Sequence, residues 1–441
     1  MKRMQKFFYT ALVAVIALSV LLPGSVSAAA KAKPVYSINY TSGTDGYSYF
    51  IGKNGTLINV SFKKKGKVTT TEITAVAPNG KTTKWSEKGS GEFDARYGIN
   101  SKGKEVVYVY NAEKRKVTGL DTSLKKRWEY EFAKSDTYAL TDRSQTDSTQ
   151  DGSYPLNPNY KITIDGKKVK TKNVNPLVQQ VGPYEYRVNE KNQTIQKKDR
   201  ATGKVLWNKR AFDLQDKDGK TLEARSIYAA SIDSEGNVFA NAHYGKIDAQ
   251  IVAVNSNGEV KWNKTGYMND RKRVVGDILY YDYVDPRHVD LFSQSDYDIV
   301  VVNKYTGKQI RTYGPVSGLA PDFFVTIRGN NLYVAGDYLA EILNSKGKVI
   351  ASYKSPKGRN ISSYGFDNKN NFYIQSGYKP GTKGQNGWIF IYSDKGKLIG
   401  KKKFDQEHYD QFLIDPAGKH HYQMEIIDSV SRMKLNIYKY E

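Results

Sequence analysis

A short motif recurs along most of the 441-residue chain and limits the folds open to it more than any other feature. In its clearest copy, residues 196–207, a half-polar segment runs through Asp199 and Thr202-Gly203 to Trp207. Asp can bond its own backbone, Gly adopts positive φ readily, and Trp offers a large apolar surface to bury. The motif therefore predicts a hairpin whose second strand carries a buried aromatic residue.

Six other segments carry imperfect copies of this hairpin, and some have lost the Trp. With Gly203, their turn residues are 44, 79, 55, 49, 40 and 49 residues apart. Trp128, Trp207 and Trp262 stand four residues after the turn residue, but Trp85 stands five after it, so the direction of its side chain is open. A period of about 40 to 50 residues with several short strands predicts a β-propeller. The other six turn residues are Gly80, Leu124, Gly258, Gly307, Gly347 and Gly396.

A second hairpin turn precedes the first in most repeats. Each copy starts with an apolar residue, which Gly, Asn or Asp and further polar residues follow, as is typical of a tight turn. Each repeat thus holds four strands, A to D, with one turn joining A to B and the Gly203-type turn joining C to D. The copies begin at Ile51, Ile99, Ile232, Phe366 and Ile414.

The last repeat predicts how the ring closes. After Gly418 it has room for strands B and C, expected around 421–427 and 433–438, but not for D. Residues 35–40 alternate like a strand and precede the first A strand near Tyr47. We expect this segment to supply the missing strand, because closure removes two open sheet edges. Seven complete repeats and this shared one predict an all-β propeller with eight four-stranded blades.

The 79-residue step between Leu124 and Gly203 is longer than one repeat. We expect it to hold one blade and an insertion at 135–176, which is rich in Ser, Thr, Asp, Asn and Gly and has a hairpin signal at Asp165-Gly166. A ninth blade is the alternative. No linker or shift in composition marks a second domain, so residues 29–441 are expected to form a single, monomeric propeller domain.

Residues 1–28 have the organisation of a secretory signal. Three basic residues precede an uncharged run of 16 residues from Phe7 to Leu22, and Val26-Ser27-Ala28 forms a cleavage site. The run is short for a bilayer span, so we expect cleavage rather than an anchor helix. The chain has no Cys, hence no site for lipid attachment, thiol catalysis or a disulfide. The mature protein is expected to be secreted, without a transmembrane segment, with the cell wall of a single-membrane bacterium as one destination.

The mature chain is strongly basic. Without residues 1–28 it has 65 Lys and Arg against 45 Asp and Glu, a net charge of +20. One explanation is that Lys keeps turns and edge strands soluble. The other is attraction to anionic partners, which outside a cell include acidic glycans, wall polyphosphates, phospholipid headgroups and nucleic acid.

Lysine also recurs at one position of the repeat. It follows the C–D turn residue in six of seven copies, and Glu259 is the exception. All C–D turns of a propeller emerge at one end of the ring, so the pattern predicts a ring of ammonium groups. A protein partner is the alternative to an anionic polymer there. The candidate residues are Lys81, Lys125, Lys204, Lys308, Lys348 and Lys397, with Lys102, Lys104 and Lys419 of the A–B turns at the same end.

The stretch from Asp199 to Trp207 resembles the repeat of the pyrroloquinoline-quinone (PQQ) type of eight-bladed propeller. In that family the Trp docks each blade against its neighbour, which implies docking roles for Trp128, Trp207 and Trp262. The superfamily holds quinoprotein alcohol dehydrogenases as well as cofactor-free members, among them the periplasmic scaffold of outer-membrane protein assembly. Fold therefore does not decide function.

The dehydrogenase alternative requires a Trp platform, often a vicinal Cys pair, a bound calcium ion and an Asp base. The segment 213–219 resembles a calcium loop, but its first and twelfth positions are Leu214 and Arg225, so we interpret it as a polar hairpin turn. His420 and His421 are adjacent in an expected strand and cannot jointly hold a metal. We expect a non-enzymatic binding or scaffold propeller without cofactor or metal. A glycan-active propeller with paired carboxylates is a further alternative.

Overall fold

The computed structural model describes residues 36–440, apart from 42–43, 91–92, 101, 134–152, 158–159, 171–177, 190–193, 211–213, 216–220, 223–225, 244–248, 267, 269–272, 285–296, 315–323, 379–385, 406–409 and 430–431. The predicted signal, 1–28, lies outside the described residues. All regular elements of the described chain are β-strands. A helix with the length and apolarity to cross a membrane is not found among these residues.

Seven antiparallel sheets are each built from four consecutive strands. The first four are β2 (Thr44–Ile51), β3 (Leu57–Lys65), β4 (Val68–Val76) and β5 (Thr82–Ser90); β6 (Phe93–Ile99), β7 (Glu105–Asn111), β8 (Lys116–Leu120) and β9 (Lys126–Glu131); β13 (Val178–Val181), β14 (Tyr184–Asn189), β15 (Thr194–Asp199) and β16 (Val205–Arg210); and β19 (Ser226–Ile232), β20 (Val238–His243), β21 (Ala249–Val254) and β22 (Val260–Thr265).

The other three continue the same pattern towards the end of the chain. They are β23 (Val274–Val275), β24 (Ile278–Val284), β25 (Tyr297–Asn303) and β26 (Gln309–Tyr313); β27 (Phe324–Arg328), β28 (Asn331–Ala335), β29 (Leu339–Asn344) and β30 (Val349–Lys354); and β31 (Arg359–Phe366), β32 (Phe372–Tyr378), β33 (Asn386–Tyr392) and β34 (Leu398–Asp405).

The eighth four-stranded sheet joins the two ends of the chain. It contains β35 (Asp410–Ile414), β36 (His421–Ser429), β37 (Arg432–Tyr440) and β1 (Tyr36–Thr41), in the order β1-β37-β36-β35. Six residue pairs connect β1 to β37, from Tyr36 opposite Ile437 to Thr41 opposite Arg432. Its first strand, β35, contacts both β31 and β2. The predictions of eight four-stranded blades and of closure by an N-terminal strand are confirmed, and the protein is a β-propeller.

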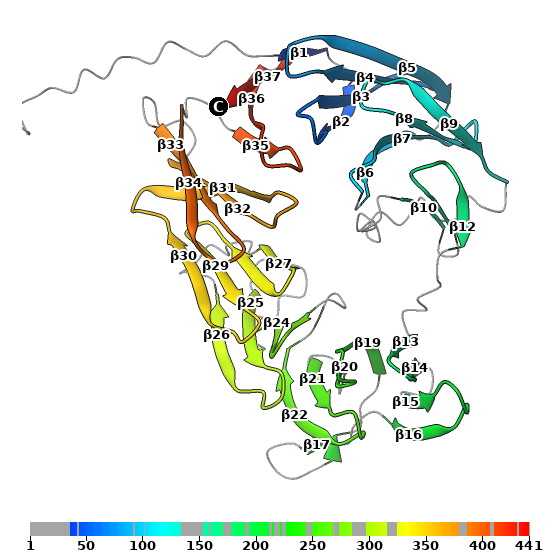
Figure 1. Ribbon diagram of the computed structural model, residues 1–441, viewed down its shortest axis with the longest axis vertical. Helices are drawn as coiled ribbons and strands as arrows, with labels where there is room; N and C mark the ends of the chain where they lie inside the picture. Colours follow the sequence, from blue (N-terminus) through cyan, green and yellow to red (C-terminus); the bar gives the residue numbers. More distant parts are fainter. Residues whose placement is uncertain are drawn as a thin grey trace, which may run out of the picture.

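In the seven sheets of consecutive strands the chain runs outward from the first strand to the fourth, and in the closing sheet β1 takes the fourth position. Figure 1 shows the sheets following one another from blue to red, with first strands such as β2, β27 and β31 on the inside and fourth strands such as β22, β26 and β30 on the outside. The first strands of neighbouring sheets approach one another, as β35 does with β2 and β31. The fourth strands therefore form the outer edges of the ring.

The apolar core is repeated between successive sheets. Middle strands such as β7 and β32 are buried along almost their whole length. In β7 the buried residues 106–110 are all apolar or aromatic, whereas β32 also buries Gln375 and Ser376. One cluster, for example, joins Ile58 and Ile73 of the first sheet to Val107, Leu120 and Leu124 of the second. Packing of this kind makes each sheet depend on its neighbours for burial of its apolar surface.

Two smaller sheets complete the described structure. The hairpin predicted through Asp165-Gly166 is present, and with a further strand it forms a three-stranded sheet inside the predicted insertion. Tyr154 and Ile162 of this sheet are buried against the second blade. The strands are β10 (Tyr154–Asn157), β11 (Tyr160–Ile162) and β12 (Lys168–Lys170), and the other small sheet is the hairpin of β17 (Leu214–Gln215) and β18 (Thr221–Leu222).

Candidate functional site

The A–B and C–D turns lie at the same end of each sheet, because the strands alternate in direction. We call the surface that they form the turn face, and the surface formed by the B–C turns and the connections between sheets the opposite face. Hydrogen bonds that reach the turns of one sheet from the turns or turn-proximal strand ends of its neighbour show that these ends lie together. They join Lys53 Nζ to the Gly103 carbonyl (2.5 Å), Asp277 N–H to the Ser345 carbonyl (2.7 Å), Asn368 N–H to the Pro416 carbonyl (2.7 Å), and the Tyr422 hydroxyl to the Gly55 carbonyl (2.6 Å).

The C–D turns are built by their own side chains. Asp199 Oδ1 accepts hydrogen bonds from the N–H and the hydroxyl of Thr202, each at 2.8 Å, and these bonds hold the pKa of Asp199 below its usual value. Gly203 then adopts a φ of 74°, and Asp199 N–H closes the turn on the Lys204 carbonyl at 2.9 Å. This geometry leaves the residue after the Gly exposed at the start of the fourth strand.

The structure places all six predicted lysines on the turn face, and each is exposed. They stand on six different blades, three on each side of the blade that carries Glu259 at this position. With the residues that the structure describes, none of the six forms an ion pair, whereas Glu259, at the same position of the repeat, pairs with Lys261 at 3.1 Å. These lysines are Lys81, Lys125, Lys204, Lys308, Lys348 and Lys397.

The A–B turns add further lysines to the turn face. Lys102, Lys104 and Lys419 are exposed there, and Lys104 contacts Asp165 of the three-stranded sheet. Lys167 occupies the same position as the six predicted lysines, directly after Gly166, and it was missed. The sequence did contain the signal, a Gly followed by Lys. However, the strands beside this turn are short, and the turn falls inside the 79-residue step between Leu124 and Gly203.

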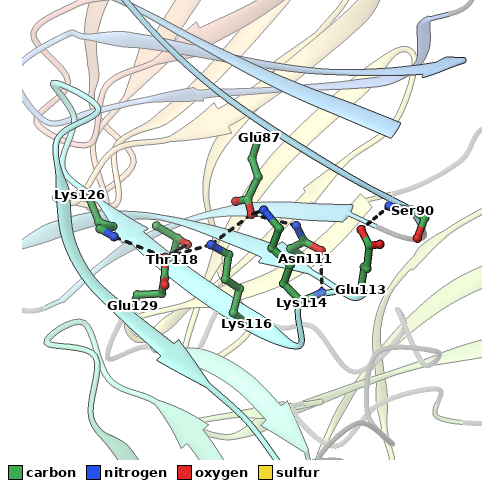
Figure 2. A network of polar contacts seen from close by, with 9 residues as sticks. All are labelled: Glu87, Ser90, Asn111, Glu113, Lys114, Lys116, Thr118, Lys126 and Glu129. Carbon is green, nitrogen blue, oxygen red and sulfur yellow. Dashed lines mark hydrogen bonds and ion pairs between the residues drawn. The ribbon is translucent and has the colours of Figure 1, made fainter. Parts of the chain in front are cut away.

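The opposite face of the first two blades has a different electrostatic arrangement. Figure 2 shows Lys114 of the β7–β8 turn and Lys116 of β8 converging on the buried Glu87 of β5. Their ammonium groups lie 2.9 and 3.1 Å from its carboxylate. Asn111 donates to the same carboxylate at 2.9 Å. Burial alone would raise the pKa of Glu87, but the hydrogen bonds from the two lysines outweigh it, and the pKa lies below its usual value. The lysines of this network are therefore satisfied within the protein.

The three predicted docking residues contact the next sheet in the same way. Each indole N–H donates to a backbone carbonyl in the following sheet's turn: Trp128 to Ile164 (3.1 Å), Trp207 to Ser256 (3.0 Å) and Trp262 to Lys304 (2.8 Å). Trp262 is buried, at 8% exposure, and the other two are half-buried. A Cβ on Gly307, where φ is 66°, would lie 2.9 Å from the Trp262 ring, so this turn requires Gly both for its backbone and for close approach.

The five Trp of the chain all stand on third or fourth strands. They are Trp85, Trp128, Trp207, Trp262 and Trp388. The quinone site that the family resemblance implies has a Trp platform, and no Trp of this chain stands on a first or second strand. With no Cys in the chain either, the residues present do not fit the quinone site that the family resemblance implies.

A buried ion pair between blades was not anticipated from the sequence. Lys304, in the turn after β25, reaches back to the A–B turn of the preceding blade, where its ammonium group lies 2.8 Å from Asp233 and 3.2 Å from Glu235. The side chains of Lys304 and Asp233 are 4% and 3% exposed. No other pair of neighbouring blades has Lys at the position of Lys304 together with Asp at the position of Asp233, so the repeat pattern did not indicate this pair.

His421 is buried at the interface between the closing sheet and its predecessor. Lys402 Nζ of β34 lies 3.1 Å from its Nδ1, and the Tyr373 ring is 5.3 Å away, centroid to centroid. His420 instead bonds Asp415 at 2.5 Å, so the two adjacent histidines have separate partners. Burial first, and then the Lys402 charge, lower the pKa of His421 to about 4.

This shift predicts a loss of stability in acid. Because the pKa of His421 is lower in the folded chain than its ordinary value of about 6.5, its neutral form stabilises the fold above that pH, and the contribution is lost as the pH falls through about 4. Between pH 7 and 4 the wild type should lose about 2 kcal/mol more unfolding free energy than His421→Gln, measured by urea denaturation. Parallel pH profiles for the two proteins would contradict this role.

No group of three or more His, Asp or Glu side chains placed to hold a metal ion occurs among the described residues. The segment that resembles a calcium loop, 213–219, contains β17, which pairs with β18 just after the segment, as in a hairpin. Residues 216–220 themselves, and with them most of that loop, lie outside the described residues.

No protein family and no curated protein sequence matches the chain. Among solved structures, BamB from Moraxella catarrhalis is 16% identical, over 78% of this chain and 94% of its own, with a TM-score of 0.32. The Cps50 (Swd1) β-propeller domain from Myceliophteria thermophila is 11% identical, over 80% and 98%, with a TM-score of 0.27. The dihydro-heme d1 dehydrogenase NirN, in complex with DHE, is 9% identical, over 91% and 79%, with a TM-score of 0.31. Similarities as low as these do not support any function for this chain. The fold is assigned from the order and pairing of its own sheets.

Proposed function

We propose that the protein is an exported, non-enzymatic binding propeller with PQQ-type repeats, and that its turn face docks on an anionic polymer of the cell envelope. The observation that carries the proposal is the exposed lysine at the same position of six blades, which pairs with no carboxylate of the described residues. A polymer with regularly spaced phosphates can contact several of these positions at once, so weak individual contacts add up to useful retention.

The contrast with the opposite face supports a binding role for these lysines. There, Lys114 and Lys116 are held by the buried carboxylate of Glu87, which uses their charge to stabilise the contact between blades. The six lysines that follow the C–D turn residues have no such carboxylate partner among the described residues, and a net charge of +20 in the mature chain adds long-range attraction to a polyanion. The secretory organisation of residues 1–28 would bring the protein to an envelope surface.

Charge reversal on the turn face tests this function. The combined variant Lys204→Glu, Lys308→Glu, Lys348→Glu and Lys397→Glu should reduce retention on purified cell walls at low salt by about tenfold or more, because four cationic contacts become repulsive. Retention is measured as the fraction of protein that sediments with the walls. Raising the ionic strength should release the wild type as well.

A matched control reverses four exposed lysines of the opposite face: Lys64, Lys65, Lys67 and Lys357. This control changes the net charge by the same amount and should retain most of the binding. If both variants lost wall retention equally, the retention would be explained by nonspecific net charge and not by the lysines of the turn face. Turnover of alcohols by the protein with added PQQ and calcium, measured with a dye acceptor, would contradict the non-enzymatic assignment.

A further inference from the structure

The fourth strands, which form the outer edges of the ring, differ in whether they contain a β-bulge. In β9, β16, β22, β26, β30 and β34 the pairing with the third strand shifts by one residue near the turn, so each has a β-bulge. A bulge bends an edge strand and makes it a poor template for another strand. β5 has no bulge: its nine residues pair continuously with β4, from Val76 opposite Thr82 to Val68 opposite Ser90. β1, which closes the ring, is also regular but has six residues.

The register of β5 shows which of its backbone groups face outward. Ala77 N–H donates to the Lys81 carbonyl at 2.9 Å, which makes this a hydrogen-bonded pair. Such pairs alternate with non-hydrogen-bonded ones along an antiparallel ladder. The N–H and C=O groups of the even-numbered residues of β5 therefore point away from β4 to the outside of the ring. These residues are Thr82, Lys84, Ser86, Lys88 and Ser90.

One outward group of β5 already binds a carboxylate. Ser90 N–H donates to Glu113 Oε2 of the second blade at 2.5 Å, as Figure 2 shows. The outward N–H groups from Thr82 to Lys88 have no acceptor among the described residues. Within the described part of the chain, residues 82–88 thus have no strand partner on their outer side.

The side chains along this edge indicate the charge of its partner. Lys84, Ser86 and Lys88 are exposed on one side of β5, whereas Trp85 and Glu87 on the other side pack against the second blade. Neither Lys84 nor Lys88 pairs with a carboxylate of the described residues. If two copies of the protein paired antiparallel about Ser86, Lys84 of one would face Lys88 of the other. Like charges directly opposite are destabilising, so the edge disfavours self-association and favours an acidic strand.

We propose that β5 is a site of strand addition that binds an extended acidic segment of a partner protein. The segment pairs antiparallel with residues 82–88, and its backbone completes the outward hydrogen bonds. Two carboxylates four residues apart on one side of the segment lie opposite Lys84 and Lys88. This site is separate from the turn face and does not depend on the function proposed there.

A short peptide tests the proposal directly. The probe is a capped, fluorescein-labelled peptide, Thr-Val-Glu-Val-Thr-Val-Glu-Val-Thr, and its partner has Lys in place of both Glu. Fluorescence anisotropy with the full mature protein at 0.15 M salt should show saturable binding of the Glu peptide and about tenfold weaker binding of the Lys peptide. Reversal of the edge by Lys84→Glu with Lys88→Glu should exchange these preferences.

The backbone contribution is tested by Ser86→Pro. The Ser86 N–H faces outward, so proline removes a hydrogen bond to the added strand without removing one to β4, and proline is tolerated at such edge positions. This variant should keep the wild-type melting temperature and bind the Glu peptide at least about tenfold more weakly, since the ring also obstructs the incoming strand. Should the variant melt lower, a Glu peptide with an N-methyl group on its central Thr replaces it as the test and should likewise fail to bind the wild type.

Several outcomes would overturn the proposal. Absence of saturable binding of the Glu peptide is one. Binding that responds to Lys84→Glu with Lys88→Glu but not to the proline or to N-methylation would show attraction by charge alone. Loss of binding in the turn-face variant, with β5 unchanged, would place the peptide on the turn face. Dimers of the free protein that Ser86→Pro dissociates would make a second copy, not an acidic partner, the occupant of the edge.

Discussion

A mature protein that begins at Thr41 should melt at least about 5 °C lower than one that begins at residue 29. The shorter chain lacks β1, whose pairing from Tyr36 opposite Ile437 onward forms the fourth strand of the closing sheet. Its loss leaves β37 with an open edge and removes the covalent return of the chain to its first blade. The melting temperature is measured by circular dichroism at a low protein concentration, where an exposed edge causes less aggregation.

The matched control for this deletion begins at Tyr36, so that it keeps β1 and lacks only residues 29–35. This control should melt like the mature protein. Equal melting temperatures for the proteins that begin at Tyr36 and at Thr41 would show that the strand contributes nothing to closure.

Truncation of Trp262 should have the second large effect. Trp262→Ala should lower the unfolding free energy by about 3 to 5 kcal/mol, because it removes a buried side chain that packs between two blades and leaves a cavity. It also removes the donor to the Lys304 carbonyl. Urea denaturation, monitored by circular dichroism, measures the change through the midpoint and slope.

Two comparisons separate packing from hydrogen bonding at this position. Trp262→Phe keeps much of the apolar surface but not the N–H, so it should cost less than Trp262→Ala. Trp207→Ala should also cost less, since Trp207 is only half-buried. An unchanged urea midpoint for Trp262→Ala would show that the residue does not dock the blades.

The blades were predictable because their turns depend on local chemistry. Asp199, Thr202 and Gly203 form their turn with hydrogen bonds inside a few residues, so the pattern is visible in the sequence wherever it recurs. The closing strand was predictable for a different reason, since the last repeat lacked one strand and the chain start had one to spare. Both inferences need only short stretches of sequence and the geometry of a ring.

Contacts between blades were less predictable because they do not repeat. Lys304 meets Asp233 across 71 positions of the chain, and neither neighbouring pair of blades uses the same residues. The repeat in which Arg311 stands at the Trp position is a second example. Where Arg311 replaces it, Ile310 at the bulge packs against the next blade's turn, within 2.7 Å of where a Cβ on Gly347 would lie. A register shift of this kind has no signature in the spacing of the turns.

Trp85 shows how the fold absorbs an irregular repeat. Its strand has one residue more between the turn and the Trp, and the strand has no bulge. Trp85 therefore pairs opposite Ile73. This partner lies two positions further from its turn than the partner of Trp262 lies from its own turn. The extra residue and the missing bulge compensate, and Trp85 packs on the same core cluster as Leu124 of the next blade. The regular edge of β5 is a consequence of this compensation.

Lysine footprinting tests most directly whether the turn face is the surface that binds an anionic polymer. The mature protein is treated with an amine-acetylating reagent, with and without soluble inorganic polyphosphate as the anionic probe, and the modified positions are quantified by mass spectrometry. Docking through the turn face predicts that polyphosphate protects Lys204, Lys308, Lys348 and Lys397 several-fold, while Lys64, Lys65, Lys67 and Lys357 on the opposite face react as before. Equal protection of both sets, or protection of the opposite face alone, would contradict the assignment of the turn face as the binding surface.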